Sequence, residues 1–153
     1  MILLSSAFEN FDPIPVQYTG EGEDTSPPLR WQDVPEGTHS LALVCDDPDA
    51  PHHTWDHWIL YNIPPTIGVL AEGLKALPHG IQSCLNSWGK TGYGGPNPPS
   101  GKHRYFFTLY ALDTVLQLPE DATKADLLQA LQNHILAEAS LVGVYERKHS
   151  KKK

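Results

Sequence analysis

The sequence has few of the features that mark secreted, membrane-spanning or repeat proteins. Its only two cysteines, Cys45 and Cys84, form no Cys-x-x-Cys pair, so no disulfide framework is indicated and both thiols are expected to be free. The first ten residues lack a basic segment followed by a long apolar one, so they do not resemble a signal peptide. No apolar run approaches the ~18–20 residues that cross a bilayer. These absences predict a cytoplasmic protein that does not span a membrane.

Basic residues are also scarce outside the C-terminus. The chain carries 11 Lys and Arg against 18 Asp and Glu, but five of the basic residues lie within residues 147–153. Residues 1–146 therefore hold six basic and 18 acidic residues, a net charge of −12, which repels phosphate backbones and argues against nucleic acid as a partner. We interpret residues 147–153 as a basic, disordered tail outside the domain. Contact of this tail with an anionic surface is the alternative interpretation.

Length and turn residues indicate one domain built mainly from strands. A chain of 153 residues fits a single domain, here residues 1–146. Its 14 prolines and 12 glycines are spread along the chain, as in β-rich proteins with many turns. The expected fold class is mainly β: a two-sheet, antiparallel, β-sandwich-like fold with a few peripheral helices, including one near the C-terminus. Strands are expected at residues 14–19, 29–31, 39–45, 56–63 and 104–112.

One helix is predicted near the C-terminus. Thr123 is a suitable N-cap, and Asp126 three residues later favours the positive end of a helix. Gly143 is expected to end this helix. The apolar residues that recur at helical spacing between these positions are Leu127, Leu128, Leu131, Ile135 and Leu136.

Two polar segments carry the residues that could perform chemistry. Residues 46–58 crowd Asp and His between prolines, which hold side chains in place with little entropy to lose. Residues 93–105 are rich in glycine and proline, and glycines let backbone N–H groups form a site that binds anions. His57 lies within one predicted strand, and His103 stands directly before another. Long loops such as residues 88–102 are usually functional when they occur inside a compact domain.

Metal binding and hydrolysis are the alternatives that these residues leave open. A metal site built from His52, His53 and His57 would need three or four converging ligands. His52 and His53 are adjacent, however, and point to opposite sides of an extended chain, so we expect no metal and no cofactor. A hydrolase could use Asp47 to orient His57, although the sequence contains no Gly-x-Ser-x-Gly nucleophile motif.

Three segments together resemble the phosphatidylethanolamine-binding protein family, specifically its bacterial and archaeal Raf-kinase-inhibitor-like branch. Residues 18–31 resemble the acidic, glycine-bearing entry of the family with its Ser-Pro-Pro-Leu-x-Trp sequence. Residues 47–58 resemble its first pocket motif, Asp-Pro-Asp-Ala-Pro followed by Trp-Asp-His-Trp. Residues 95–105 resemble its second motif, Gly-Pro-Asn-Pro-Pro-Ser-Gly-Lys-His-Arg-Tyr. The resemblance extends over residues 8–145, nearly the whole domain.

The resemblance implies two packed antiparallel sheets with a small pocket at one end. In this family the pocket binds phosphate-like, acetate-like or phosphoethanolamine-type anions. Asp56 departs from the pattern, because a histidine or a bulky aromatic residue is expected at its position. A cis peptide bond between Ala50 and Pro51 is also expected in the pocket loop. Carried over by position, the ligand-binding residues are Asp47, Asp49, His57, Gly95, Pro96, Pro98, His103 and Tyr105.

The predicted function is that of a non-catalytic module that binds a small anion or a phospholipid head group. His57 and His103 would donate hydrogen bonds to the anion, Tyr105 would add a hydroxyl or a wall, and Asp47 would orient an imidazole. A nearby carboxylate favours the charged form of histidine, so Asp47 is expected to extend binding to higher pH. Two alternatives are inhibition of a protease or kinase through the protein surface, and weak hydrolysis by Asp47 and His57. The resemblance also allows a homodimer.

Overall fold

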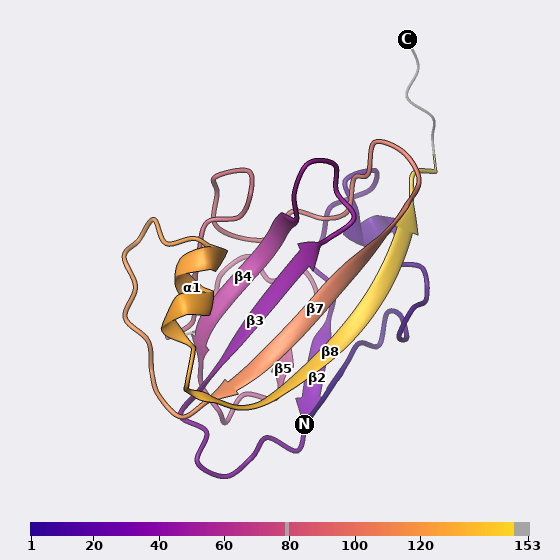
Figure 1. Cartoon of the computed structure of the whole chain (residues 1–153). Helices are drawn as coiled ribbons and strands as arrows, with labels where there is room; N and C mark the ends of the chain where they lie inside the picture. Colours follow the sequence, from indigo (N-terminus) through magenta and orange to yellow (C-terminus); the bar gives the residue numbers. More distant parts are fainter. Residues whose placement is uncertain (79, 149–153) are drawn as a thin grey trace.

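The computed structural model describes residues 1–78 and 80–148. His79 and residues 149–153, the distal part of the predicted tail, lie outside the described residues. The chain forms two antiparallel sheets (Figure 1), which confirms the predicted fold class. In spatial order, the larger sheet consists of β6 (Gln82–Ser83), β4 (Trp55–Ile63), β3 (Ser40–Asp47), β7 (Lys102–Leu112) and β8 (Ile135–Glu146). The smaller sheet consists of β1 (Ile2–Leu4), β2 (Leu29–Gln32) and β5 (Val69–Leu70).

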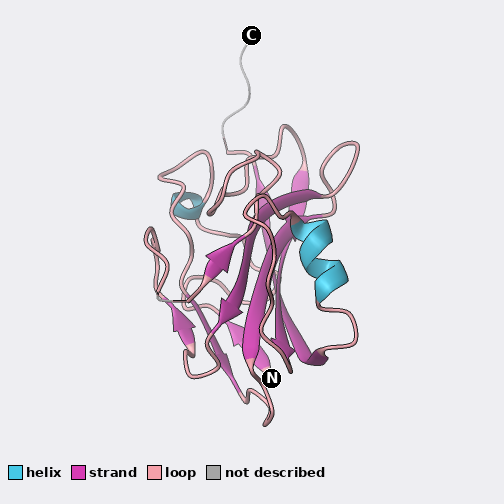
Figure 2. Ribbon diagram, turned by 90° about the vertical axis from the view of Figure 1, so that its left-hand side faces the viewer, coloured by secondary structure: helices cyan, strands magenta, loops and turns pink. Residues whose placement is uncertain are grey.

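The larger sheet is covered on both faces. One face packs on the smaller sheet, and the other carries the single α-helix of the described residues, α1 (Lys124–Ala130), as Figure 2 shows. Successive residues of β3 alternate between the two cores: Leu43 packs between the sheets, whereas Val44 packs beneath the helix with Leu127. A strand buried on both faces reads as a continuous apolar run, which explains the apolar pattern predicted as a strand at residues 39–45.

The strands predicted at residues 29–31, 39–45, 56–63 and 104–112 are confirmed as β2, β3, β4 and β7. The strand predicted at residues 14–19 is wrong. That segment contains a short 3-10 turn, η1 (Val16–Tyr18), and contacts the larger sheet beside an isolated bridge between Pro13 and Val144, where the Ile14 amide donates to the Val144 carbonyl at 2.7 Å. The Thr19 hydroxyl donates a hydrogen bond to the Val16 carbonyl at 2.8 Å, which supports the turn in place of a ladder.

The predicted C-terminal helix is correct at its start and wrong in its length. Thr123 and Asp126 form a reciprocal capping box, as the sequence indicated. The helix ends at Ala130, however, and Asn133 adopts a positive φ of 70° before β8 begins at Ile135. From there to Glu146 the chain pairs with β7 along its length. Residues 135–146 therefore form a strand on the otherwise unpaired edge of β7, although Ile135 and Leu136 continue the helical spacing of the preceding leucines.

One further expectation is corrected by the backbone, and the start of the predicted tail contacts the domain. The described residues contain no cis peptide bond, so Ala50–Pro51 is trans, and the loop turns instead at His52, where φ is 77°. Arg147, assigned to the tail from sequence, bonds to the domain: its Nε donates to the Pro98 carbonyl at 2.9 Å. The Lys148 amide likewise donates to a carboxylate oxygen of Glu21 at 2.7 Å. The first two residues of the predicted tail thus contact the domain. No helix within the described residues is long and apolar enough to cross a membrane.

Candidate functional site

The candidate site lies where β3 ends and β4 and β7 begin. On β7, alternation places His103 and Tyr105 on the inner face, as it does for Asp47 at the end of β3. Simple alternation does not place His57 on this face; a β-bulge does. The β3–β4 register shifts between the pairs Cys45–Trp58 and Asp46–Asp56, so His57 is the extra residue of a β-bulge. Bulges re-aim side chains beside functional sites, and this one turns His57 toward the same cavity.

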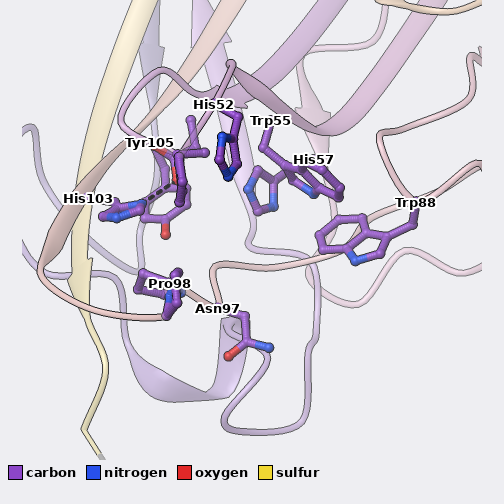
Figure 3. Close-up of a pocket in the computed structure, with 12 residues that line it drawn as sticks. His52, Trp55, His57, Trp88, Asn97, Pro98, His103 and Tyr105 are labelled. Carbon is purple, nitrogen blue, oxygen red and sulfur yellow. Dashed lines mark hydrogen bonds and ion pairs between the residues drawn. The ribbon is translucent and has the colours of Figure 1, made fainter. Parts of the chain in front are cut away.

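These side chains border a cavity of about 340 Å³. Figure 3 shows the cavity and the residues around it. Its size suits a small ligand held by a few polar groups against an apolar wall. The residues that line it are Asp47, Ala50, Pro51, His52, Trp55, His57, Trp88, Asn97, Pro98, Pro99, His103 and Tyr105.

Asp47 and His103 form a buried pair at the cavity floor. The Nδ1 of His103 lies 2.7 Å from Oδ2 of Asp47 (Figure 3), and the two residues are 7% and 3% exposed. A carboxylate accepts hydrogen bonds, so Nδ1 carries the proton and donates. The other carboxylate oxygen accepts the Asp49 amide at 2.8 Å. Asp47 therefore fixes the orientation of the His103 ring, as predicted for one imidazole, and leaves Nε2 of that ring for a ligand.

His57 is held by the backbone and not by a carboxylate. Its Nδ1 lies 2.6 Å from the Gly94 carbonyl oxygen, which can only accept, so here too Nδ1 is the donor. Burial lowers the pKa of His57, outweighing the Gly94 hydrogen bond and the negative charge of Asp47, which raise it. Asp47 therefore favours the charged form of His57, as expected, but burial outweighs its effect and the net shift of the pKa is downward. The Asp47–His57 pair of the hydrolase alternative is replaced by Asp47–His103.

Tyr105 lies between the two imidazoles with an unused hydroxyl. Its ring centroid is 5.3 Å from that of His57 and 6.4 Å from that of His103. The residue is 1% exposed, and its hydroxyl oxygen makes no hydrogen bond of good geometry within residues 1–78 and 80–148, although the Asp47 carboxylate lies close enough to interact with it. Burial raises the pKa of Tyr105, and the charge of Asp47 raises it further, so the hydroxyl keeps its proton. A buried polar group without a hydrogen-bond partner destabilises the fold. A ligand bound in the cavity would give the Tyr105 hydroxyl such a partner.

Aromatic residues form the opposite wall. Trp88 meets the ring of His57 edge to face at 5.2 Å and that of Trp55 at 5.5 Å. Trp88 is 45% exposed, so it stands at the cavity mouth. Sequence reasoning missed Trp88, Asn97 and His52 as lining residues. An exposed tryptophan at the start of a long glycine-rich loop is the signal that could have identified the first of them.

Three of the predicted ligand residues support the cavity without lining it. Asp49 pairs with Arg104, whose Nε and Nη2 donate to its two carboxylate oxygens at 2.9 Å each. The hydrogen bonds to Arg104 lower the pKa of Asp49 to about 2. Gly95 and Pro96 anchor the second loop: the Gly95 amide donates to Asp24 at 2.7 Å, and the Pro96 carbonyl accepts the Gly20 amide at 2.7 Å.

Asp56, the departure from the family pattern, points away from the cavity. Its Oδ1 lies 2.7 Å from Nζ of Lys124 on α1, on the other face of the sheet. The first loop also assembles no metal site: no group of three or more His, Cys, Asp or Glu in the described part of the chain is placed to hold a metal ion. Nδ1 of His53 instead donates to the Thr54 carbonyl, and its ring stacks on Trp55.

Comparisons with known proteins agree with this architecture. The family model described as phosphatidylethanolamine-binding protein matches residues 4–146. The UPF0098 protein of Methanothermobacter thermautotrophicus is 51% identical over 96% of this chain and 99% of its own, and that of Aquifex aeolicus is 44% identical over 96% and 89%. A solved structure of a phosphatidylethanolamine-binding protein homologue from Chlamydia trachomatis superposes with a TM-score of 0.90 at 44% identity, covering 96% of this chain and 97% of its own. Escherichia coli YbcL, described as a member of the mammalian family, gives a TM-score of 0.89 at 34% identity, covering 95% and 98%.

The two-sheet fold is matched along nearly the whole length of the chain and defines a class of proteins. The chain belongs to the phosphatidylethanolamine-binding protein family, as the resemblance of its motifs predicted.

Proposed function

We propose that the chain is a non-catalytic binding module whose cavity takes a small oxyanion, such as phosphate or the phosphate of a phospholipid head group. One observation carries the proposal. Nε2 of His57, Nε2 of His103 and the hydroxyl of Tyr105 all border one cavity and make no hydrogen bond of good geometry among the described residues. Together with the apolar wall, they provide a few converging polar groups, as small-ligand sites usually do.

The fixed ring orientations mean that the anion binds together with a proton. In each neutral imidazole Nδ1 carries the only proton and donates it to Gly94 or Asp47, so Nε2 presents a lone pair. Two lone pairs repel an anion. Protonation of Nε2 turns each ring into a charge-assisted donor, and a protonated His103 also neutralises Asp47. The bound state is therefore an imidazolium–anion pair, or a neutral ring with a protonated acid.

The same geometry favours binding over catalysis. A nucleophile at this site would need a lowered pKa or an adjacent base. Burial raises the pKa of Tyr105 and that of Cys45, which lies in the core behind the cavity. The Asp47–His103 pair orients an imidazole, but the groups around it are poor nucleophiles. An inhibitory surface for a protease or kinase remains the second hypothesis and is separated from the first by the experiment below.

The test is a calorimetric titration of phosphate at about pH 6 with wild type, His57→Ala and His103→Ala. Each variant removes one charge-assisted donor, which is expected to weaken binding by roughly ten-fold to a hundred-fold, or ~1.5–3 kcal/mol. His134→Ala is the matched control. His134 pairs with Asp113 at the same 2.7 Å, but the two side chains are 43% and 45% exposed and border no part of the cavity.

Circular dichroism establishes that each variant is folded before its affinity is compared. Wild-type affinity in both cavity variants, or no phosphate binding by the wild type, would overturn the proposal. A stoichiometric protein partner that both folded cavity variants still capture would favour the inhibitor hypothesis.

A further inference from the structure

Three charged side chains form a cluster on the helix side of the larger sheet. Nζ of Lys124 lies 3.0 Å from Oδ2 of Asp46 and 2.7 Å from Oδ1 of Asp56. The three side chains are 18%, 23% and 19% exposed, so water screens their charges only in part. One cation thus faces two carboxylates, and the cluster carries a net charge of −1. We call Lys124, Asp46 and Asp56 the charge triad.

The triad stands directly behind the proposed anion site. Asp46 precedes Asp47 on β3, and Asp56 precedes His57 on β4; Asp46 and Asp56 are register partners across the two strands. Consecutive strand residues point to opposite faces. One peptide unit therefore separates each triad carboxylate from a residue of the cavity, so the two charge systems share the same strand ends.

We propose that Lys124 is a positioning residue for the anion site, because the charge balance of the triad sets how readily His57 takes up its proton. This inference rests on the proposed function, since it is the proton on His57 that prepares the site for an anion. The titratable groups around His57 on every packed element are Asp46 and Asp47 on β3, Asp56 on β4, His103 and Tyr105 on β7, His52 in the adjoining loop and Lys124 on α1.

The sign of each contribution follows from electrostatics. Burial lowers the pKa of His57, and the charges of Asp46 and Asp56 raise it. Lys124 bonds to both carboxylates and offsets their effect. Replacing Lys124 with a neutral side chain leaves a net charge of −2 behind His57 and favours its proton. Replacing Asp56 with asparagine leaves a net charge of zero and disfavours the proton. Each substitution changes a charge a strand's width from His57 in a partly buried region. We expect it to move the titration midpoint of His57 by roughly half a pH unit.

Opposite signs separate an electrostatic role from a structural one. Lys124→Gln and Asp56→Asn break the same 2.7 Å ion pair, so any effect that comes from loosening α1 or β4 goes in the same direction in both variants. A charge effect on His57 goes in opposite directions. Lys124→Arg keeps the charge and is expected to restore wild-type behaviour. Lys75→Gln is the matched control, since it makes the same charge change at an exposed lysine outside the triad.

The experiment follows the imidazole resonances of His57 by NMR in the ligand-free, full-length protein between about pH 4.5 and 8.5. The expected result is a titration midpoint that rises in Lys124→Gln, falls in Asp56→Asn, and stays at the wild-type value in Lys124→Arg and Lys75→Gln. Equal midpoints in all variants, or shifts of the same sign in Lys124→Gln and Asp56→Asn, would overturn the inference.

A second titration with inorganic sulfate, which does not change charge in this range, connects the triad to binding. The pH above which sulfate affinity declines reports the titration of the free protein. It is expected to move with the His57 midpoint, upward in Lys124→Gln and downward in Asp56→Asn. If the midpoints shift in opposite directions but sulfate does not bind, control of the His57 proton by the triad stands and the proposed anion-binding function fails. If the His57 midpoint moves but the pH above which sulfate affinity declines stays the same, the link between Lys124 and the anion site is overturned.

Discussion

The two faces of the larger sheet differ in whether their ionisable side chains are fully paired within the chain. On the helix face, Asp46 and Asp56 meet Lys124 within 3.0 Å. On the cavity face, one residue further along each strand, Asp47 orients a histidine ring and His57 bonds to a carbonyl. The helix-side carboxylates have a counter-charge within the chain. The cavity side has two ring nitrogens and the Tyr105 hydroxyl with no counter-group among the described residues. This difference supports the proposal that the cavity face receives a ligand, with the paired charges of the helix face standing one residue behind it.

The largest effect is expected when the buried Asp–His pair is broken. Asp47→Ala leaves the Nδ1 proton of His103 and the Asp49 amide without their acceptor in a buried site, which is expected to lower the free energy of unfolding by about 3 kcal/mol. Asp113→Ala removes a pair of the same 2.7 Å length at the surface, and its cost is expected to stay below about 1 kcal/mol. Urea unfolding at neutral pH measures both. Equal losses in the two variants would show that burial does not distinguish these pairs.

Tyr105→Phe is expected to separate binding from stability. The hydroxyl of Tyr105 is buried without a partner, so its removal should leave the free energy of unfolding unchanged or raise it by up to ~1 kcal/mol. The same change should weaken phosphate binding about ten-fold, because one donor to the anion is lost. Thermal unfolding and calorimetry on the same sample provide both values. A variant that is less stable and binds phosphate normally would assign the hydroxyl to the fold.

The smallest effect is expected at the Asp49–Arg104 pair on the outer side of the loop. Hydrogen bonds from Arg104 lower the pKa of Asp49 to about 2, from an ordinary value of 3.8. A carboxyl group with a lowered pKa stabilises the folded state above its unfolded pKa, and this contribution disappears as the pH falls through the folded value. Asp49→Asn should therefore cost a little stability near pH 7, and the difference from wild type should shrink below about pH 4 and vanish below about pH 2. A difference that does not depend on pH would show that the carboxylate charge is not responsible.

The sequence predicted the parts of the site that are local, and it missed those that depend on pairing. Asp47, His57, His103 and Tyr105 lie in two motifs whose polar residues stand beside apolar strand segments. The partner of Asp47 is 56 residues away at His103, and no local pattern distinguishes it from His57. The β-bulge that re-aims His57 depends on the register between two strands, which the sequence does not display.

The fold shows the same division. Predictions held where one face or both faces of a strand are apolar, as in β3 and β7. They failed at β8, where Leu131, Ile135 and Leu136 suggested a continued helix. The alternation of Ala137, Ala139 and Leu141 toward the core is a strand signal that the leucine spacing obscured. Pairing with the edge of β7 favours the strand over the helix in this segment. The sequence marked Asp56 as a departure from the family pattern without fixing its side; a lysine 68 residues further on holds it on the face opposite the cavity.

The central claim is that an anion enters this cavity together with a proton, because both imidazoles use their Nδ1 protons inside the protein. Calorimetry with sulfate at about pH 7, in two buffers of different ionisation enthalpy, tests this directly. Since burial lowers the pKa of His57 below its ordinary value of 6.5, the ring is mostly neutral at this pH. The account predicts uptake of about one proton or more per sulfate bound and an affinity that falls about ten-fold for each pH unit above the midpoint. Sulfate binding with no proton uptake, and with the same affinity from about pH 5.5 to 8, would contradict it.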